Sequence, residues 1–271
     1  MVDTHAHLDM RAFNNDRGEV TARALDAGVG TIITVGTNLN SSKRAIEIAE
    51  KHPEVLAAVG FHPHDATAVD KAAIATLGEI ARHPRVVAIG ELGLDFYRDY
   101  SPREAQLQAM KWQLELAAKL ELPVIIHCRQ AERVMIDLLC DWVSLYKGPH
   151  GQCTGVIHCF NGHNDNARRY LDMGFCLSLG AYIGYPGAAS TYDVIRSIPE
   201  DRLLIETDCP FLPPQSHRGK RNEPSYLPLT IELLAKIKGK PSEEVARKTT
   251  SNALRLFHIA KNAVTGSFGE Y

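Results

Sequence analysis

The chain has 271 residues, and with 45% hydrophobic and 23% charged residues it has the composition of an ordinary globular protein. No apolar run is long enough to span a bilayer, and no signal peptide is visible before the first predicted strand. The net charge of −2, with a pI near 6.6, excludes nucleic-acid binding through bulk positive charge, so a phosphate partner needs a local basic cluster or bound cations.

Short apolar and β-branched runs recur along the chain, with helical stretches between them. They are nearly continuous in apolar character, which is typical of parallel strands covered on both faces. Strands are predicted at residues 2–8, 31–35, 55–60, 86–91, 123–127, 155–160, 175–179 and 203–207. Eight such strands fit a closed (β/α)8 barrel or an open doubly wound sheet, and sequence period alone does not separate the two.

Two of the intervening helices have clear start signals. Ser101 is predicted as an N-cap, with Pro102 at the first helical position and Glu104 completing a capping box. An apolar face then continues through Leu107, Met110, Leu114 and Ala118. A second helix is predicted after Pro241, with Val245, Leu254 and Phe257 at apolar positions.

No linker or internal repeat divides the chain. We therefore predict one domain over residues 1–260 and a frayed tail over 261–271, which shows no periodicity. The six cysteines are Cys128, Cys140, Cys153, Cys159, Cys176 and Cys209, and none forms a C-x-x-C pair. They are interpreted as free, mostly buried thiols in a reducing compartment, which favours a cytoplasmic location and no membrane contact.

Histidines and carboxylates gather at the ends of five predicted strands. His5 and His7 lie two residues apart and so share one face of the first strand. The others are Glu91 on the fourth strand, His127 followed by Arg129 on the fifth, His158 on the sixth, and Glu206 with Asp208 on the eighth. An isolated H-x-H would be a weak signal, and a single polar strand end is commonly a helix cap.

Five strands that end in this way favour the barrel. The carboxyl ends of barrel strands converge on one mouth, whereas an open sheet would usually keep the first and eighth strands apart. The predicted fold is therefore a single-domain α/β (β/α)8 TIM barrel. Four histidines with Glu91 and Asp208 exceed what one four-coordinate ion needs, and two ions that share a carboxylate are the natural solution.

Motifs along almost the whole chain resemble the TatD family of metal-dependent deoxyribonucleases, within the amidohydrolase-like barrels. They are DTHAHLD, GFHPHDA, IGELGLDFY, IHCRQA, HCFNG, ETDCPFL, RGKRNEP and NALRLF. The resemblance implies a TIM barrel, divalent cations and 3′-to-5′ exonuclease activity on DNA, either single-stranded or at 3′ ends. It also implies that the metal ligands are His5, His7, Glu91, His127, His158 and Asp208. Glu91 stands where many amidohydrolases carry a carbamylated lysine, which points to the TatD branch.

The remaining polar residues predict the handling of substrate. Asp208 and Glu91 are candidate catalytic groups, with Asp208 orienting or deprotonating the attacking water, and His62 is a third candidate for proton transfer. Substrate contacts are predicted for His64, Arg129, Arg218, Arg221 and Asn222, the last three from the loop after the eighth strand. Asp95 and Tyr97 could shape the pocket or form a structural turn.

Three features leave the chemistry open. Imidazole-rich ligation suits zinc, manganese, nickel or cobalt, whereas the family is usually described with magnesium. Gln130, Asn161 and the stretch GAYIGYPGA depart from the family pattern and bear on substrate preference. The alternatives are a metal hydrolase of another ester or amide, such as an aminoacyl-tRNA or a lactone, and a nucleic-acid-binding protein with a relict site.

Overall fold

The structure is a computed structural model that describes residues 1–146 and 154–260. It contains one eight-stranded sheet whose parallel strands follow each other in chain order. The strands are β1 (Val2–Ala6), β2 (Thr31–Val35), β3 (Val55–Val59), β4 (Val86–Asp95), β5 (Val124–Arg129), β6 (Gly155–Ile157), β7 (Cys176–Leu179) and β8 (Leu203–Ile205).

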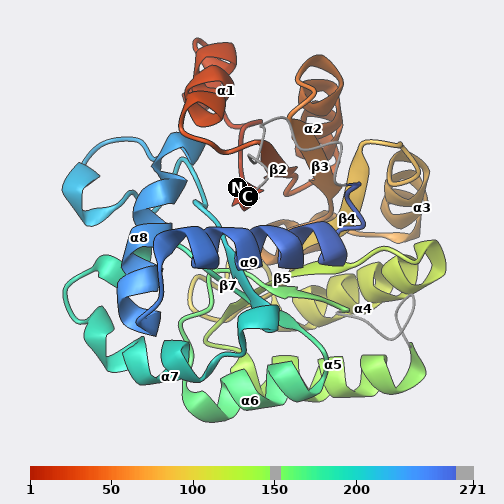
Figure 1. Cartoon of the computed structure of the whole chain (residues 1–271). Helices are drawn as coiled ribbons and strands as arrows, with labels where there is room; N and C mark the ends of the chain where they lie inside the picture. Colours follow the sequence, from red (N-terminus) through yellow and green to blue (C-terminus); the bar gives the residue numbers. More distant parts are fainter. Residues whose placement is uncertain (147–153, 261–271) are drawn as a thin grey trace.

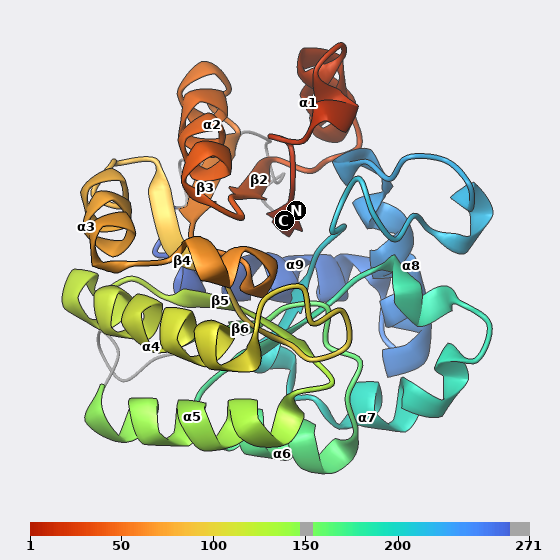
Figure 2. The same cartoon turned by 180° about the vertical axis from the view of Figure 1, so that it is seen from behind.

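The last strand returns to the first. Ala6 and Cys209 form a parallel bridge. The amide of His7 donates to the carbonyl of Cys209, and the amide of Asp208 donates to the carbonyl of His5, both at 2.8 Å. The sheet therefore closes into a barrel, which confirms the predicted (β/α)8 fold (Figures 1 and 2).

Helices surround this barrel. They are α1 (Arg17–Asp26), α2 (Leu39–Lys51), α3 (Lys71–Ile80), α4 (Arg103–Leu120), α5 (Glu132–Leu145), α6 (Asn164–Asp172), α7 (Tyr192–Ser197), α8 (Leu227–Lys238) and α9 (Ser242–Leu256). Figure 1 shows α9 lying across one end of the barrel. Asn252 of α9 donates to the carbonyl of Leu203, where β8 begins, so α9 covers the end at which the strands start.

Alternation along the strands separates core from site. Buried residues at every second strand position form one cluster with Ala253, Leu256 and Phe257 at the end of α9. On three of these strands, the next residue on the same face is ionisable and lies toward the opposite end of the barrel. The pairs are Ile125 with His127, Val156 with His158, and Leu204 with Glu206.

The strand ends differ from the prediction where the site lies. β6 and β8 stop at Ile157 and Ile205, so His158 and Asp208 occupy the turns beyond them. By contrast, β4 continues past Glu91 and pairs with β5 as far as Asp95 opposite Arg129. Gly93 permits this close pairing because it has a φ of +152°, and a Cβ there would lie 1.9 Å from the carbonyl oxygen of His127.

The predicted cap of α4 is wrong. Pro102 occupies the N-cap position, and no side chain caps the helix. Ser101 instead donates its hydroxyl hydrogen to the carbonyl of His64 at 2.7 Å, a tertiary contact that local spacing could not show. The predicted apolar face is partly confirmed, because Met110 and Leu114 are buried against the core.

Cysteine burial is only partly as predicted. Cys128, Cys140, Cys159 and Cys209 are free thiols, but Cys140 is exposed and only Cys209 and Cys176 are fully buried. Cys153 and the predicted frayed tail lie outside the described residues. Within residues 1–146 and 154–260, no helix is long and apolar enough to cross a membrane.

Candidate metal centre

Donor atoms from β4, from the end of β1 and from the segment beyond β8 form a first group at the mouth. Nε2 of His5 lies 3.2 Å from Nε2 of His7 and 3.4 Å from Oε2 of Glu91. Oδ1 of Asp208 lies 3.5 Å from Nε2 of His7 and 3.9 Å from Nε2 of His5. Four residues separated by up to two hundred positions thus present one donor atom each to a common point.

The spacing of this first group suits a metal ion. The two imidazole nitrogens lie 3.2 Å apart, and their separations from the two carboxylate oxygens run from 3.4 to 3.9 Å. Ligands that hold one ion tetrahedrally at about 2.0–2.2 Å are about 3.3–3.6 Å apart. Two imidazoles and two carboxylates at this spacing can hold a divalent cation.

A second group uses the other oxygen of Glu91. Oε1 of Glu91 lies 2.7 Å from Nδ1 of His127 and 2.8 Å from Nε2 of His158. The two imidazole nitrogens are 3.3 Å apart. Glu91 therefore stands between the two groups, with Oε2 facing the first and Oε1 facing the second. The structure brings all six predicted ligands together, and their role as ligands stays a prediction.

The carboxylates and imidazoles of the site stabilise each other's charged forms. Burial raises the pKa of Glu91, but the charge of His158 and the hydrogen bonds of His127 and His158 outweigh burial and hold that pKa well below its ordinary value. Burial lowers the pKa of His7, but the hydrogen bond with Asp208 and the charge of Glu91 raise it to about 9. The carboxylates are thus ionised and ready to bind a cation, which would displace protons from the imidazoles.

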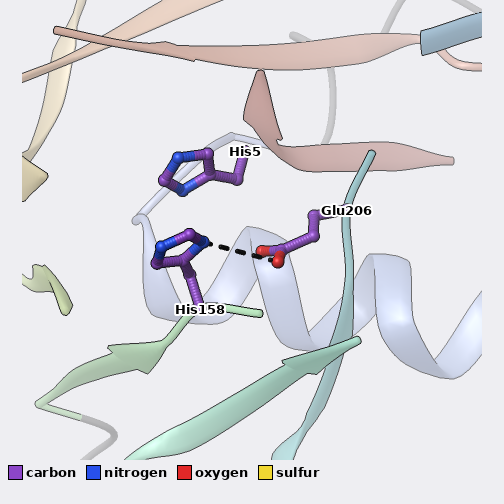
Figure 3. A group of neighbouring side chains, drawn as sticks. All are labelled: His5, His158 and Glu206. Atoms are coloured by element: carbon purple, nitrogen blue, oxygen red, sulfur yellow. Dashed lines mark ion pairs between the residues drawn. The ribbon is translucent and has the colours of Figure 1, made fainter. Parts of the chain in front are cut away.

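Glu206 lies beside His5 and His158 (Figure 3), and it approaches the nitrogen of His158 that does not face Glu91. The rings of His5 and His158 are stacked, with centroids 4.0 Å apart and planes inclined by 13°. Their Nε2 atoms face Glu91, whereas Nδ1 of His158 lies 3.5 Å from Oε1 of Glu206. One donor atom from each of these three buried residues lies within 4.8 Å of the other two.

Glu206 is placed to fix the orientation of the His158 ring. Among the described residues, Nδ1 of His5, Nδ1 of His158 and Oε2 of Glu206 are buried without a hydrogen-bond partner, and Oε1 of Glu206 accepts the amide hydrogen of Cys159 at 2.6 Å. A carboxylate behind a metal-binding imidazole fixes its tautomer and raises its basicity. The sequence places Glu206 at its strand end but gives it no role. The alternation of Leu204, Glu206 and Asp208 was the signal that could have revealed it.

Replacing Glu206 with glutamine is expected to weaken metal binding by about 10- to 100-fold, because the amide is a poorer acceptor for the Nδ1–H group of His158. Calorimetric titration of a divalent metal into the metal-free protein measures this change. Glu54→Gln is the matched control, since buried Glu54 faces Nδ1 of His52 at 3.6 Å and contacts no predicted ligand. Equal metal affinity in wild type and Glu206→Gln would contradict the role.

His62 presents a hydrogen-bond donor to the site. Its Nδ1 accepts the amide hydrogen of His64 at 3.1 Å, so Nε2 carries the ring proton. That Nε2 lies 3.5 Å from Oε1 of Glu91. Burial holds the pKa of His62 well below its ordinary value, so the ring is neutral. Although its nitrogen lies within metal-binding distance of Glu91 and His127, it offers N–H rather than a lone pair.

Asp95 positions two histidines at once. Its Oδ2 lies 2.9 Å from Nε2 of His64 and 3.3 Å from Nε2 of His127. Its Oδ1 accepts the amide hydrogens of Tyr97 and Arg98, which fixes the turn after β4. Asp95 thus orients His127 behind the second group. His64, predicted to contact substrate, already uses Nε2 for this carboxylate.

The structure does not support two of the predicted substrate contacts. The guanidinium of Arg221 donates to Asp16 at 2.6 and 2.9 Å and to Glu223 at 2.8 Å. Asn222 is fully buried, and its amide donates to the carbonyls of Thr207 and Phe211. Both side chains secure the β8–α8 loop, Asn222 by its buried bonds to backbone carbonyls and the partly exposed Arg221 by its ion pairs. Their predicted role as phosphate contacts is therefore corrected to a structural one.

Arg129 and Arg218 remain candidates for contact with a substrate phosphate. Within the described part of the chain neither forms an ion pair, and both side chains are exposed. The guanidinium carbon of Arg129 lies 4.0 Å from the ring centre of Tyr97, and that of Arg218 lies 4.5 Å from the ring centre of Tyr185. Arg129, at the end of β5, and Arg218, in the β8–α8 loop, are each held over an aromatic face with no ion-pair partner among the described residues, as a phosphate contact requires.

Comparisons with known proteins agree on one family. A family model described as TatD related DNase matches residues 2–258. The uncharacterized metal-dependent hydrolase YabD of Bacillus subtilis (strain 168) is 41% identical, and the match covers 96% of this chain and 99% of YabD. The 3′-5′ ssDNA/RNA exonuclease TatD of Erwinia tasmaniensis is 38% identical, with 96% and 100% covered.

A solved structure has the same fold. The crystal structure of YjjV, a TatD homolog from Escherichia coli K12, matches this chain with a TM-score of 0.89 and 32% identity, covering 96% of this chain and 98% of that one. The range matched by the family model includes all six predicted ligands.

Proposed function

The chain belongs to the TatD family of related DNases, hydrolases that act on phosphodiester bonds, and we propose that it removes nucleotides from the 3′ end of single-stranded DNA or RNA with the help of two divalent ions. The observation that carries the proposal is the placement of Glu91. Its two oxygens face separate sets of donors, as a carboxylate shared by two ions does.

Two sets of residues would hold the ions. Glu91 is common to both, with His5, His7 and Asp208 in one set and His127 and His158 in the other. When bound, the ions supply Lewis-acid activation of a water molecule and offset charge on the scissile phosphate. Their identity is left to experiment among magnesium, zinc, manganese, nickel and cobalt, with the imidazoles favouring the last four.

The proton-handling groups lie on the substrate side of the site. The side chain of Asp208 is 15% exposed, whereas those of His5 and Glu91 are 0% and 3% exposed. Of the two carboxylate ligands, Asp208 is therefore the one that can also reach a water molecule in the mouth and accept its proton. His62, with its proton on Nε2, suits a hydrogen bond to a phosphate or leaving oxygen, and Arg129 adds positive charge at the rim.

The test compares end-labelled substrates in protein of known metal content. Single-stranded DNA carrying a 5′ label is expected to shorten progressively, and the same strand with a 3′ label should release a labelled mononucleotide at once. Phosphorothioates at the last linkages should block the reaction, and duplex DNA should be cut more slowly. Hydrolysis of a simple carboxylic ester without any cleavage of DNA or RNA would favour the alternative hydrolase instead.

A further inference from the structure

Three exposed aromatic rings lie beside the candidate metal centre. Among the described residues, the exposed large apolar side chains are Leu25, Tyr97, Tyr100, Val134, Leu145 and Phe211. Leu25, Val134 and Leu145 lie on the surrounding helices. All three aromatic members of the set lie instead in the loops that follow β4 and β8, at the mouth of the barrel.

Two of these rings, those of Phe211 and Tyr100, contact histidines of the site. Phe211 is 49% exposed, and its ring centre lies 6.0 Å from that of His7, in the first donor group. Tyr100 is 66% exposed, and its ring centre lies 4.7 Å from that of His64, which Asp95 links to His127 in the second group. Phe211 thus lies against a residue of the first donor group, and Tyr100 is linked to the second through His64 and Asp95.

The backbone holds these rings in place. Phe211 donates its amide hydrogen to the carbonyl of Asp208 and accepts a hydrogen bond from the buried side chain of Asn222. The neighbour of Tyr100, Ser101, is anchored to the carbonyl of His64. Tyr97, beside Tyr100, carries Arg129 over one face at 4.0 Å. Fixed rings at the rim leave their outer faces to solvent or to a planar ligand.

We propose that Phe211 and Tyr100 are stacking platforms for the two unpaired bases on either side of the scissile phosphate. This inference rests on the proposed function, because the phosphate must sit at the two donor groups. The chain has a net charge of −2 and so cannot gather a polynucleotide by bulk charge. Stacking supplies affinity that is independent of charge, and only an unpaired base presents a face to a side chain.

The experiment measures the affinity of fluorescein-labelled short oligo(dT), protected by terminal phosphorothioates, by anisotropy in the presence of the activating metal. Phe211→Ala and Tyr100→Ala are each expected to raise Kd about tenfold to a hundredfold. Two further strands carry an abasic site at the last or the next-to-last nucleotide. Each substitution should lose its effect on one of these strands, and the two substitutions should respond to different strands.

Salt dependence separates stacking from phosphate contact. The slope of log Kd against log salt should be unchanged in the two aromatic variants, whereas Arg218→Ala should reduce it by about one. Phe211→Tyr should retain wild-type affinity. Leu145→Ala removes an apolar side chain that is 89% exposed on α5 and is the matched control, with no change expected.

Two outcomes would overturn the inference alone. One is wild-type affinity in both aromatic variants while the wild-type protein binds and shortens oligo(dT). The other is an equal loss on base-bearing and abasic strands, which would mean that the rings support their loops rather than bases. A wild-type protein that neither binds nor shortens the strand would overturn the proposed function together with this inference.

Discussion

Glu91→Ala is expected to abolish the binding of both ions and to lower nuclease activity by more than about 10⁴-fold, the upper end for loss of a single catalytic group. The reason is geometric. Oε2 of Glu91 lies 3.4 Å from Nε2 of His5, and Oε1 lies 2.8 Å from Nε2 of His158, so one side chain serves both groups. Calorimetric titration counts the ions, and the release of labelled nucleotide gives the rate.

Glu91→Gln tests whether the two oxygens of Glu91 serve different ions. The amide keeps one oxygen acceptor and turns an NH2 group toward the other donor group, where it cannot bind a cation. This variant is therefore expected to bind one ion and to remain inactive. Two ions bound by Glu91→Ala, or wild-type activity in either variant, would exclude the shared-carboxylate arrangement.

The fold of these variants must be checked apart from their activity. Removing one partner of a buried charged cluster typically costs about 3–5 kcal/mol of unfolding free energy. Circular dichroism and thermal unfolding of the metal-free proteins measure that cost. Glu54→Ala removes another buried glutamate, one that faces His52 away from the mouth, and should bind both ions with wild-type activity.

The barrel and the meeting of the six residues could be predicted because both depend on local periodicity. Alternation places His127 and His158 two residues beyond Ile125 and Val156, on the same face of their strands. Barrel closure then brings these strand ends to one mouth. Strand limits were less predictable, since β4 extends to Asp95 only because β5 pairs with it that far.

The roles of loop residues could not be predicted in the same way. Arg221 and Asn222 belong to a basic, polar stretch that suggests an exposed phosphate contact. Their partners, Asp16 and the carbonyl of Thr207, lie 205 and 15 residues away, and no local pattern encodes those contacts. The exposure of Phe211 is equally non-local, because the fold of the same loop determines it.

The separate roles of Glu91, Asp208 and Glu206 could be assigned only from the structure. The sequence identified Glu91 as a candidate ligand but not which oxygen faces which histidine. It placed Glu206 and Asp208 at the same strand end and gave a role to Asp208 alone. In the structure Asp208 meets the Nε2 atoms of His5 and His7, and Glu206 approaches Nδ1 of His158.

Asp208→Asn is expected to lower turnover by about 10²- to 10⁴-fold while changing substrate affinity much less. Asparagine has nearly the same size and can still direct an oxygen toward Nε2 of His7 and the first donor group, where Oδ1 of Asp208 lies 3.5 Å away. It cannot accept a proton at neutral pH. The loss should therefore appear in kcat rather than in KM or in the anisotropy-derived Kd.

Weakened metal binding would imitate this loss, so the rates must be compared at metal concentrations that saturate both proteins. Asp9→Asn is the matched control: Asp9 is also a buried carboxylate just beyond β1, but it accepts a hydrogen bond from Ser41 at 2.6 Å and belongs to neither donor group. A rate that recovers fully at saturating metal would make Asp208 a ligand only, and the proton of the attacking water would then need another acceptor. A persistent loss in Asp208→Asn, absent from Asp9→Asn, would locate the base on Asp208, which is the more exposed of the two carboxylate ligands.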